Sequence, residues 1–256
     1  MLAQARNNAS RNSRRRMRGF SLIEMAMVLL VLGLILGGML TALGASDAAK
    51  RRADAAATLQ QISDALYGFA QANGRLPCPA TDVSAGDEAP AAGGNCTSYA
   101  GFVPGRKLGL QGSFNANGLL EDPWGNPYRY MVANKPVSGV NAMTSAAQFR
   151  QWFATTPPLG AGWLCVATAL NCGSGVLSDT VPAIVYSMGP DFGLAATGLQ
   201  AENVGATMGA SAYPVANDVQ FVDLAPADRP ATFDDQLTWL SINILTTRMI
   251  EAGKLP

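Results

Sequence analysis

One acidic side chain lies inside a long apolar stretch near the start of the sequence. Residues 14–18 contain four arginines, Gly19 follows, and an apolar run begins at Phe20. Glu24 is the only charged residue of this run, because the 22 residues 25–46 carry no formal charge. A carboxylate at the centre of a lipid bilayer costs about 2.5–3.5 kcal/mol, and less near the interface. The chemistry that this pattern predicts is pairing of Glu24 with a cation in the same apolar surroundings.

A helix over this run is long enough to cross a membrane. At about 1.5 Å per residue, residues 25–46 span roughly 33 Å, which matches the hydrocarbon layer. Six arginines precede the run and Lys50, Arg51 and Arg52 follow it, which predicts a cytoplasmic start and an exported C-terminal part. A secretory signal has its small-residue cleavage site after the apolar segment. Here Gly19 comes before it, so cleavage at Gly19 would leave the helix on the mature chain.

The hexapeptide Gly19-Phe20-Ser21-Leu22-Ile23-Glu24 resembles the cleavage and methylation motif of type IV prepilins and type II secretion pseudopilins. The resemblance implies that a prepilin peptidase cuts between Gly19 and Phe20 and methylates the new amine of Phe20. It also implies that Glu24 pairs with that amine on a neighbouring subunit. Without the motif, an ordinary signal anchor whose acid reaches the lipid headgroups would explain Glu24 equally well.

Charge is unevenly distributed between the leader and the rest of the chain. The 256 residues include 18 basic and 18 acidic side chains. Removing the six arginines of residues 1–19 leaves 12 basic and 18 acidic groups, a net charge of −6. The alternative interpretation of the arginine run, a nucleic-acid-binding arm, is disfavoured because an apolar segment follows at once. The predicted organisation is a cleaved cytoplasmic leader (1–19), a transmembrane half-helix (20–46), a periplasmic half-helix (47–73) and a periplasmic globular domain (74–256).

The helix is predicted to continue beyond the membrane. Leu59, Ile62, Leu66 and Phe69 recur at helical spacing within 47–72 and form one apolar stripe. Asn73-Gly74 is a typical C-terminal stop, and Pro77 prevents continuation. One helix over about 21–72 is therefore expected, and two helices with a break near Ser46-Asp47 are the alternative.

The remaining sequence predicts an α+β, pilin-like fold, in which the long N-terminal helix packs on a small antiparallel sheet with long loops. Residues 74–127 are rich in Pro, Gly, Ala and Asn and predict loops. A tight turn followed by a strand over 128–133 is predicted from the segment Asp122-Pro123-Trp124-Gly125-Asn126-Pro127-Tyr128-Arg129-Tyr130. This segment also resembles one in major pseudopilins. Ser187-Met188-Gly189-Pro190-Asp191 resembles the turn after a pseudopilin strand, although Phe192 replaces a glycine. Further strands are predicted at 162–169, 181–187, 219–224 and 237–240, a long loop at 193–217, and a helix at 242–252 capped by Ser241.

Four cysteines, Cys78, Cys96, Cys165 and Cys172, lie in the part predicted to be exported. An even count in an oxidising compartment predicts disulfides, for which three connectivities exist. Proximity in sequence favours Cys78–Cys96 and Cys165–Cys172. Zinc binding is disfavoured because the chain has neither histidine nor C-x-x-C.

The residue types disfavour catalysis. The absence of histidine excludes Ser-His-Asp, Cys-His and H-E-x-x-H chemistry, so no enzymatic activity and no cofactor are expected. Calcium is the one metal ion whose binding the sequence leaves open, with Asp218, Asp223, Asp234 and Asp235 as weak candidate ligands. Solvated loop acids are the favoured interpretation of these residues.

The function that these features predict is structural. We expect a minor pseudopilin or minor pilin, processed by prepilin peptidase and assembled with other pilins or pseudopilins on an inner-membrane platform. The expected location is the inner membrane, crossed once, with the N-terminus cytoplasmic and the C-terminal domain periplasmic, and then a filament. A type II secretion pseudopilus is favoured over a type IV pilus acting in adhesion, twitching or DNA uptake. Nucleic-acid binding and a membrane-anchored periplasmic enzyme are disfavoured alternatives.

Overall fold

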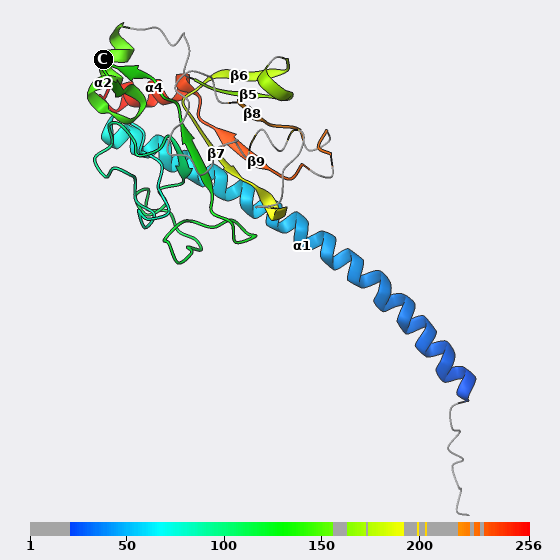
Figure 1. Ribbon diagram of the computed structural model, residues 1–256. Helices are drawn as coiled ribbons and strands as arrows, with labels where there is room; N and C mark the ends of the chain where they lie inside the picture. Colours follow the sequence, from blue (N-terminus) through cyan, green and yellow to red (C-terminus); the bar gives the residue numbers. More distant parts are fainter. Residues whose placement is uncertain are drawn as a thin grey trace, which may run out of the picture. The chain divides into compact units, whose positions relative to one another are not determined.

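The computed structural model describes residues 21–155, 163–172, 174–191, 199, 203, 220–225, 228–230 and 233–256, without the side chains of 35–45 and 171. The chain divides into two compact units, Met1–Ala48 and Ala49–Pro256. Helix α1 (Leu22–Asn73) is continuous over 52 residues and belongs to both (Figure 1). The predicted single helix is therefore confirmed, and no break occurs at Ser46-Asp47. Gly74 ends the helix with φ +71° and donates its N–H to Ala70 O at 2.8 Å, a typical left-handed stop.

The main sheet of the unit 49–256 is antiparallel and has the strand order β1-β2-β7-β9 (Figure 1). Its strands are β1 (Ala100–Phe102), β2 (Arg129–Val132), β7 (Ala183–Ser187) and β9 (Gln236–Trp239). Every residue of the two central strands β2 and β7 is buried, which agrees with strands covered on both faces.

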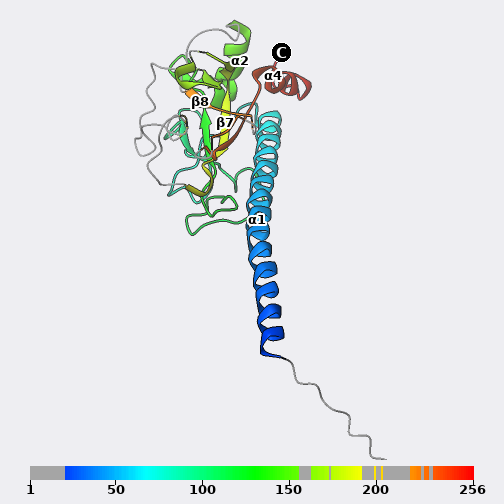
Figure 2. The same ribbon diagram turned by 90° about the vertical axis from the view of Figure 1, so that its right-hand side faces the viewer.

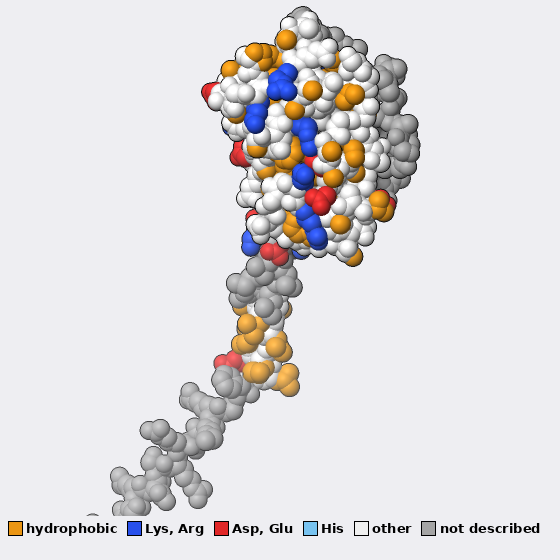
Figure 3. All heavy atoms as spheres, turned by 90° about the vertical axis from the view of Figure 1, so that its left-hand side faces the viewer, with side chains coloured by type: hydrophobic (Ala, Val, Ile, Leu, Met, Phe, Trp, Pro, Cys, Tyr) orange, Lys and Arg blue, Asp and Glu red, His pale blue; other side chains and the backbone are white. Residues whose placement is uncertain are grey.

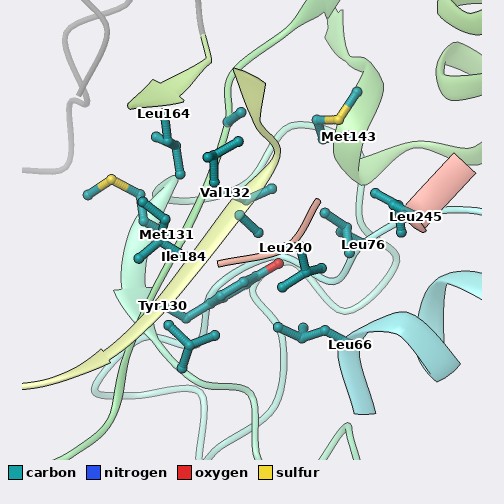
Figure 4. Close-up of a cluster of buried hydrophobic side chains, with 14 of the residues drawn as sticks. Leu66, Leu76, Tyr130, Met131, Val132, Met143, Leu164, Ile184, Leu240 and Leu245 are labelled. Atoms are coloured by element: carbon teal, nitrogen blue, oxygen red, sulfur yellow. The ribbon is translucent and has the colours of Figure 1, made fainter. Parts of the chain in front are cut away.

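The core joins one stripe of α1 to this sheet. Leu59, Ile62 and Leu66 are at most 3 % exposed and share one cluster with Tyr130 and Leu240 (Figure 4). Burial of each such side chain contributes about 1.5–3 kcal/mol. The helical spacing of these apolar residues thus directs the outer part of α1 onto the sheet.

A second sheet has the order β6-β5-β8 and departs from the expected antiparallel pattern. Its strands are β6 (Val176–Val181), β5 (Leu164–Ala167) and β8 (Gln220–Val222). The β5–β8 pair is parallel. Parallel neighbours need a crossover of a dozen or more residues, and the segment 168–219 supplies it.

Short elements make up the rest of the secondary structure described in this unit. They are β3 (Pro136–Val137), β4 (Val140–Asn141), η1 (Ala142–Thr144), α2 (Ala146–Thr155), η2 (Leu170–Cys172), η3 (Gly189–Asp191) and α4 (Ile242–Glu251). Helices α2 and α4 lie near the C-terminal end of α1 (Figure 2). Helix α2 is absent from the sequence predictions; it buries Phe149 and Trp152, and Trp152 makes an edge contact with Trp163 at 5.5 Å.

The predicted strands at 128–133, 162–169, 181–187, 219–224 and 237–240 correspond to β2, β5, β7, β8 and β9. Ser241 precedes α4 as predicted, but its side chain makes no capping hydrogen bond. Its backbone N–H instead donates to Tyr67 Oη at 2.8 Å. The predicted loop at 193–217 lies outside the described residues except for Leu199 and Asn203.

Candidate functional site

The first turns of α1 present an apolar surface that surrounds one acid. Ser21 O accepts hydrogen bonds from the N–H groups of Glu24 (3.0 Å) and Met25 (3.2 Å), which starts the helix. Every side chain from Ser21 to Leu34 is exposed, and Leu22 and Leu34 are exposed by 89 % and 70 %. Figure 3 shows hydrophobic side chains around this part of the helix. An apolar surface on all sides of a helix requires a covering of lipid or other helices.

Across the residues that the structure describes, no helix combines the length and the hydropathy that crossing a membrane requires. The spanning segment predicted at 20–46 is therefore not confirmed. The predicted processing residues Gly19 and Phe20 lie outside the described residues. Glu24 is described, in the first turn of α1.

The two turn motifs singled out in the sequence contact each other in the structure. Asp122 Oδ1 accepts from the N–H groups of Trp124 and Asn126, both at 2.9 Å, which closes the first turn. Ser187 Oγ donates to Asp122 Oδ2 at 2.5 Å, and Asn126 Nδ2 donates to Gly189 O at 2.8 Å. Burial raises the pKa of Asp122, and the hydrogen bond from Ser187 opposes that rise. These bonds fasten the turn before β2 to the turn after β7.

Three acids, Asp191, Asp234 and Asp235, lie close together at the turn that follows β7. Gly189 has φ +67°, and a Cβ there would lie 2.5 Å from Asp234 Oδ2, so only glycine fits. Burial, together with the nearby Asp191, raises the pKa of Asp234 to about 6. Burial raises the pKa of Asp235 to about 7 although Asn203 Nδ2 donates to Asp235 Oδ2 at 2.9 Å. Oδ1 of Asp235 has no hydrogen-bond partner in the described part of the chain.

The weak calcium candidates are not brought together as one ligand set. Asp218 lies outside the described residues. Asp223 forms an ion pair with Arg229 Nη2 at 3.3 Å. Asp234 and Asp235 are neighbours of Asp191, but the described residues contain no group of three or more His, Cys, Asp or Glu side chains arranged to hold a metal ion. Calcium binding stays a prediction.

We predict that Asp235→Asn removes a pH-dependent loss of stability. The pKa of Asp235 is about 7 in the folded chain, against about 3.9 when unfolded. Folding therefore favours the protonated acid, and its contribution to stability is lost as the pH rises from about 4 through 7. We expect Asp235→Asn to match the wild type near pH 4 and to be more stable at pH 8, by on the order of 4 kcal/mol.

Urea denaturation of the full chain in detergent at pH 4.5 and pH 8 measures this difference. Asp228→Asn is the matched control, because Asp228 is exposed in the same region. A stability profile of Asp235→Asn that runs parallel to the wild type across this pH range would contradict the prediction.

Both disulfides of the structure join the cysteines that are neighbours in sequence. Cys78–Cys96 closes a separation of 18 residues, and Cys165–Cys172 closes one of 7. The first bridge closes a loop and the second joins β5 to η2, and each reduces the entropy of the unfolded chain.

The sequence analysis missed a buried ion-pair network beside the first disulfide. Arg75 donates to Glu88 through Nη1 (2.7 Å) and Nη2 (2.8 Å), and the Cys78 N–H donates to Glu88 Oε2 (3.1 Å). Lys107 Nζ lies 3.4 Å from the same carboxylate. The Glu88 side chain is fully buried. The one sequence signal was an Arg and a Glu that flank Cys78 in a loop of few charges, which is too weak to identify a pair.

Comparison with known proteins adds one match. The sequence model of the prokaryotic N-terminal methylation motif matches residues 14–40. The prediction of this motif from Gly19 to Glu24 is thereby confirmed, over the leader and the first turns of α1. No curated protein matches the chain, and no solved structure does.

Proposed function

We propose that this chain, which carries the hallmark motif of type IV prepilins and pseudopilins, is a minor subunit of a type II secretion pseudopilus. Its role is structural, and it requires no cofactor. The observation that carries the proposal is the matched motif, which runs from residue 14 into a helix whose exposed apolar surface contains one acid, Glu24.

Cleavage of the leader would create a cationic partner for Glu24. Lipid is as apolar as leucine, so the hydrophobic effect does not drive such helices together within a bilayer. A carboxylate there seeks a cation. The amine of Phe20 exists only after the bond to Gly19 is cut, so processing by prepilin peptidase acts as the switch for assembly.

The proposed path starts in the inner membrane. Residues 20–46 cross it once, with the arginine-rich leader in the cytoplasm and the domain that follows in the periplasm. The apolar side chains from Leu22 to Leu34 first contact lipid and then the helices of neighbouring pilin-like subunits. Transfer between these two environments takes place on an inner-membrane assembly platform.

The contact between the two turn motifs supports the secretion branch. Both motifs resemble segments of major pseudopilins, and the Ser187–Asp122 and Asn126–Gly189 hydrogen bonds join them. The long loops of the domain 49–256 support a minor position, because loops such as 74–99 are difficult to accommodate at every position of a filament.

Mass spectrometry of the native chain tests the processing step. The expected result is a mature N-terminus at Phe20 with a methylated amine. A native chain that retains its arginine-rich start in working assemblies would contradict the proposal.

Deletion of the gene distinguishes the machine. A subunit of a secretion pseudopilus is expected to copurify with other pseudopilins, and its loss is expected to block release of exported proteins. Loss of adhesion, twitching or transformation with normal secretion would instead identify a minor pilin of a type IV pilus.

A further inference from the structure

A groove of about 710 Å³ lies in the unit 49–256, between α1 and the outer strand of the main sheet. Ala49, Ala53 and Ala56 line it from α1, and Gln236, Leu237 and Thr238 line it from β9. Alanines at positions i, i+4 and i+7 lie on one face of a helix, so this wall is smooth. The groove follows α1 from Ala49 to Gln60, about 16 Å at 1.5 Å per residue.

Within the part of the chain that the structure describes, the strand that borders the groove has one edge with no paired strand. Leu240 N–H donates to Ala183 O at 2.9 Å, and Thr238 and Gln236 lie opposite Val185 and Ser187. Residues of an antiparallel pair alternate between those bonded to the partner strand and those whose N–H and C=O point away. The backbone groups of Leu237 and Trp239 are therefore directed away from β7.

Within the described residues, no hydrogen bond satisfies these outward groups of Leu237 and Trp239. The opposite edge of the sheet is covered, because Phe102 of β1 exchanges two backbone hydrogen bonds with Ala80, at 2.8 and 2.9 Å. Free edges are commonly protected by a charge or a proline, and β9 (Gln236–Trp239) contains neither. With respect to the described residues, the edge of β9 is therefore available to pair with another strand.

Among the described residues that line the groove, Arg52 is the cation that has no ion-pair partner. Arg229 and Asp223 pair with each other at 3.3 Å, and Asp234 is engaged with Asp191. Arg52 lines the groove from α1 and is exposed, and no hydrogen bond or ion pair joins it to any described residue. An occupant that carries an acid would complement this cation.

We propose that the groove binds an extended segment of a partner polypeptide, which adds a strand to the free edge of β9 and places an acidic side chain beside Arg52. The alternating N–H and C=O groups of Leu237 and Trp239 match another extended backbone and no lipid or small anion. About five extended residues, at 3.3 Å each, fill the 16 Å length. This inference goes beyond the filament role and does not depend on it, because it concerns the groove of the unit 49–256.

Site-specific photo-crosslinking of the full chain in its native cells tests the proposal. A benzophenone amino acid replaces Gln60 in the groove, or Glu251 on the exposed side of α4 as the control position. We expect a crosslink from position 60 to another polypeptide, within a segment that contains Asp or Glu, and none to that segment from position 251.

Two pairs of variants separate strand addition from general contact. Leu237→Pro removes an outward N–H and leaves the hydrogen bonds to β7 in place, whereas Arg52→Glu reverses the charge in the groove. Each variant is expected to reduce the yield of the crosslink at least about fivefold, which corresponds to about 1 kcal/mol. Leu237→Val and Arg52→Lys keep the N–H and the charge and are expected to retain it. Hydrogen exchange of the Thr238 and Val185 amides reports whether the β7–β9 pair remains intact in Leu237→Pro.

Several outcomes would overturn the proposal. A crosslink from position 60 only to this chain itself would mean that the chain fills its own groove, and one only to lipid would identify a lipid surface. A polypeptide crosslink that both Leu237→Pro and Arg52→Glu leave unchanged would exclude the proposed strand pairing. Because the crosslink is measured whether or not a filament forms, it is independent of the mass of the mature N-terminus, which tests the proposed function.

Discussion

Replacing Glu24 with alanine is expected to leave membrane insertion and leader cleavage intact and to reduce filament incorporation at least about tenfold. Alanine suits an apolar helix better than a carboxylate does, so insertion is not impaired. The loss falls on assembly, because the variant leaves the Phe20 amine of a neighbour without its counter-ion. Truncating one partner of a buried charge pair costs about 2–5 kcal/mol, and each 1.4 kcal/mol is tenfold. Quantification of the variant in purified filaments and in membranes measures the two effects.

Two further substitutions of Glu24 separate its charge from its shape. Glu24→Gln keeps the size and loses the charge, so its incorporation is expected to fall nearly as far as that of the alanine variant. Ile23→Ala is the matched control for lost apolar surface on the same helical turn, because Ile23 is 69 % exposed. Normal incorporation of Glu24→Gln, or an equal loss in Ile23→Ala, would refute the pairing role of the acid.

The sequence predicted the parts of the fold that depend on local signals. The predicted stripe repeats within one helix, so its period identified the helix and, through Leu59, Ile62 and Leu66, its buried face. Phe69, the fourth predicted member, is only partly buried. The end of α1 was also predicted from a local signal, Asn73-Gly74, because a helix often ends at a residue with left-handed backbone conformation. The motif from Gly19 to Glu24 is also contiguous, which is why a sequence match at 14–40 recovered it.

What the sequence did not show depends on contacts between distant residues. The turn at Asp122 was predicted, but its hydrogen bond to Ser187, 65 residues away, was not. Strand β6 (Val176–Val181) is mostly exposed and lacks clear alternation, so no period distinguished it from a loop. The edge position of β9 among the described strands follows from the strand order, which no local pattern of Gln236–Trp239 encodes.

Among these contacts between distant residues, the ion-pair network around Glu88 has the largest expected effect on stability. We predict that Arg75→Met lowers the free energy of unfolding by about 3–5 kcal/mol, the usual cost of leaving one charge of a buried pair without its partner. The Glu88 side chain is fully buried and loses both guanidinium hydrogen bonds, at 2.7 and 2.8 Å. Lys107, at 3.4 Å with 35 % of its side chain exposed, compensates little. Urea denaturation with both disulfides oxidised measures the change.

A double variant tests whether the cost arises from the orphaned charge. Arg75→Met combined with Glu88→Gln removes both charges and keeps an acceptor for the Cys78 N–H, which donates to Glu88 at 3.1 Å. We expect the double variant to be more stable than Arg75→Met alone, with a coupling of about 2 kcal/mol. Lys107→Met is the control and is expected to cost under about 1 kcal/mol, because its ion pair is partly exposed. If Arg75→Met cost no more than Lys107→Met, the disulfide Cys78–Cys96 and local packing would hold this loop without the ion pair. If the double variant were as unstable as Arg75→Met, the loss would lie in packing of the Arg75 side chain over the Phe69 ring, at 5.2 Å, and not in the charge of Glu88.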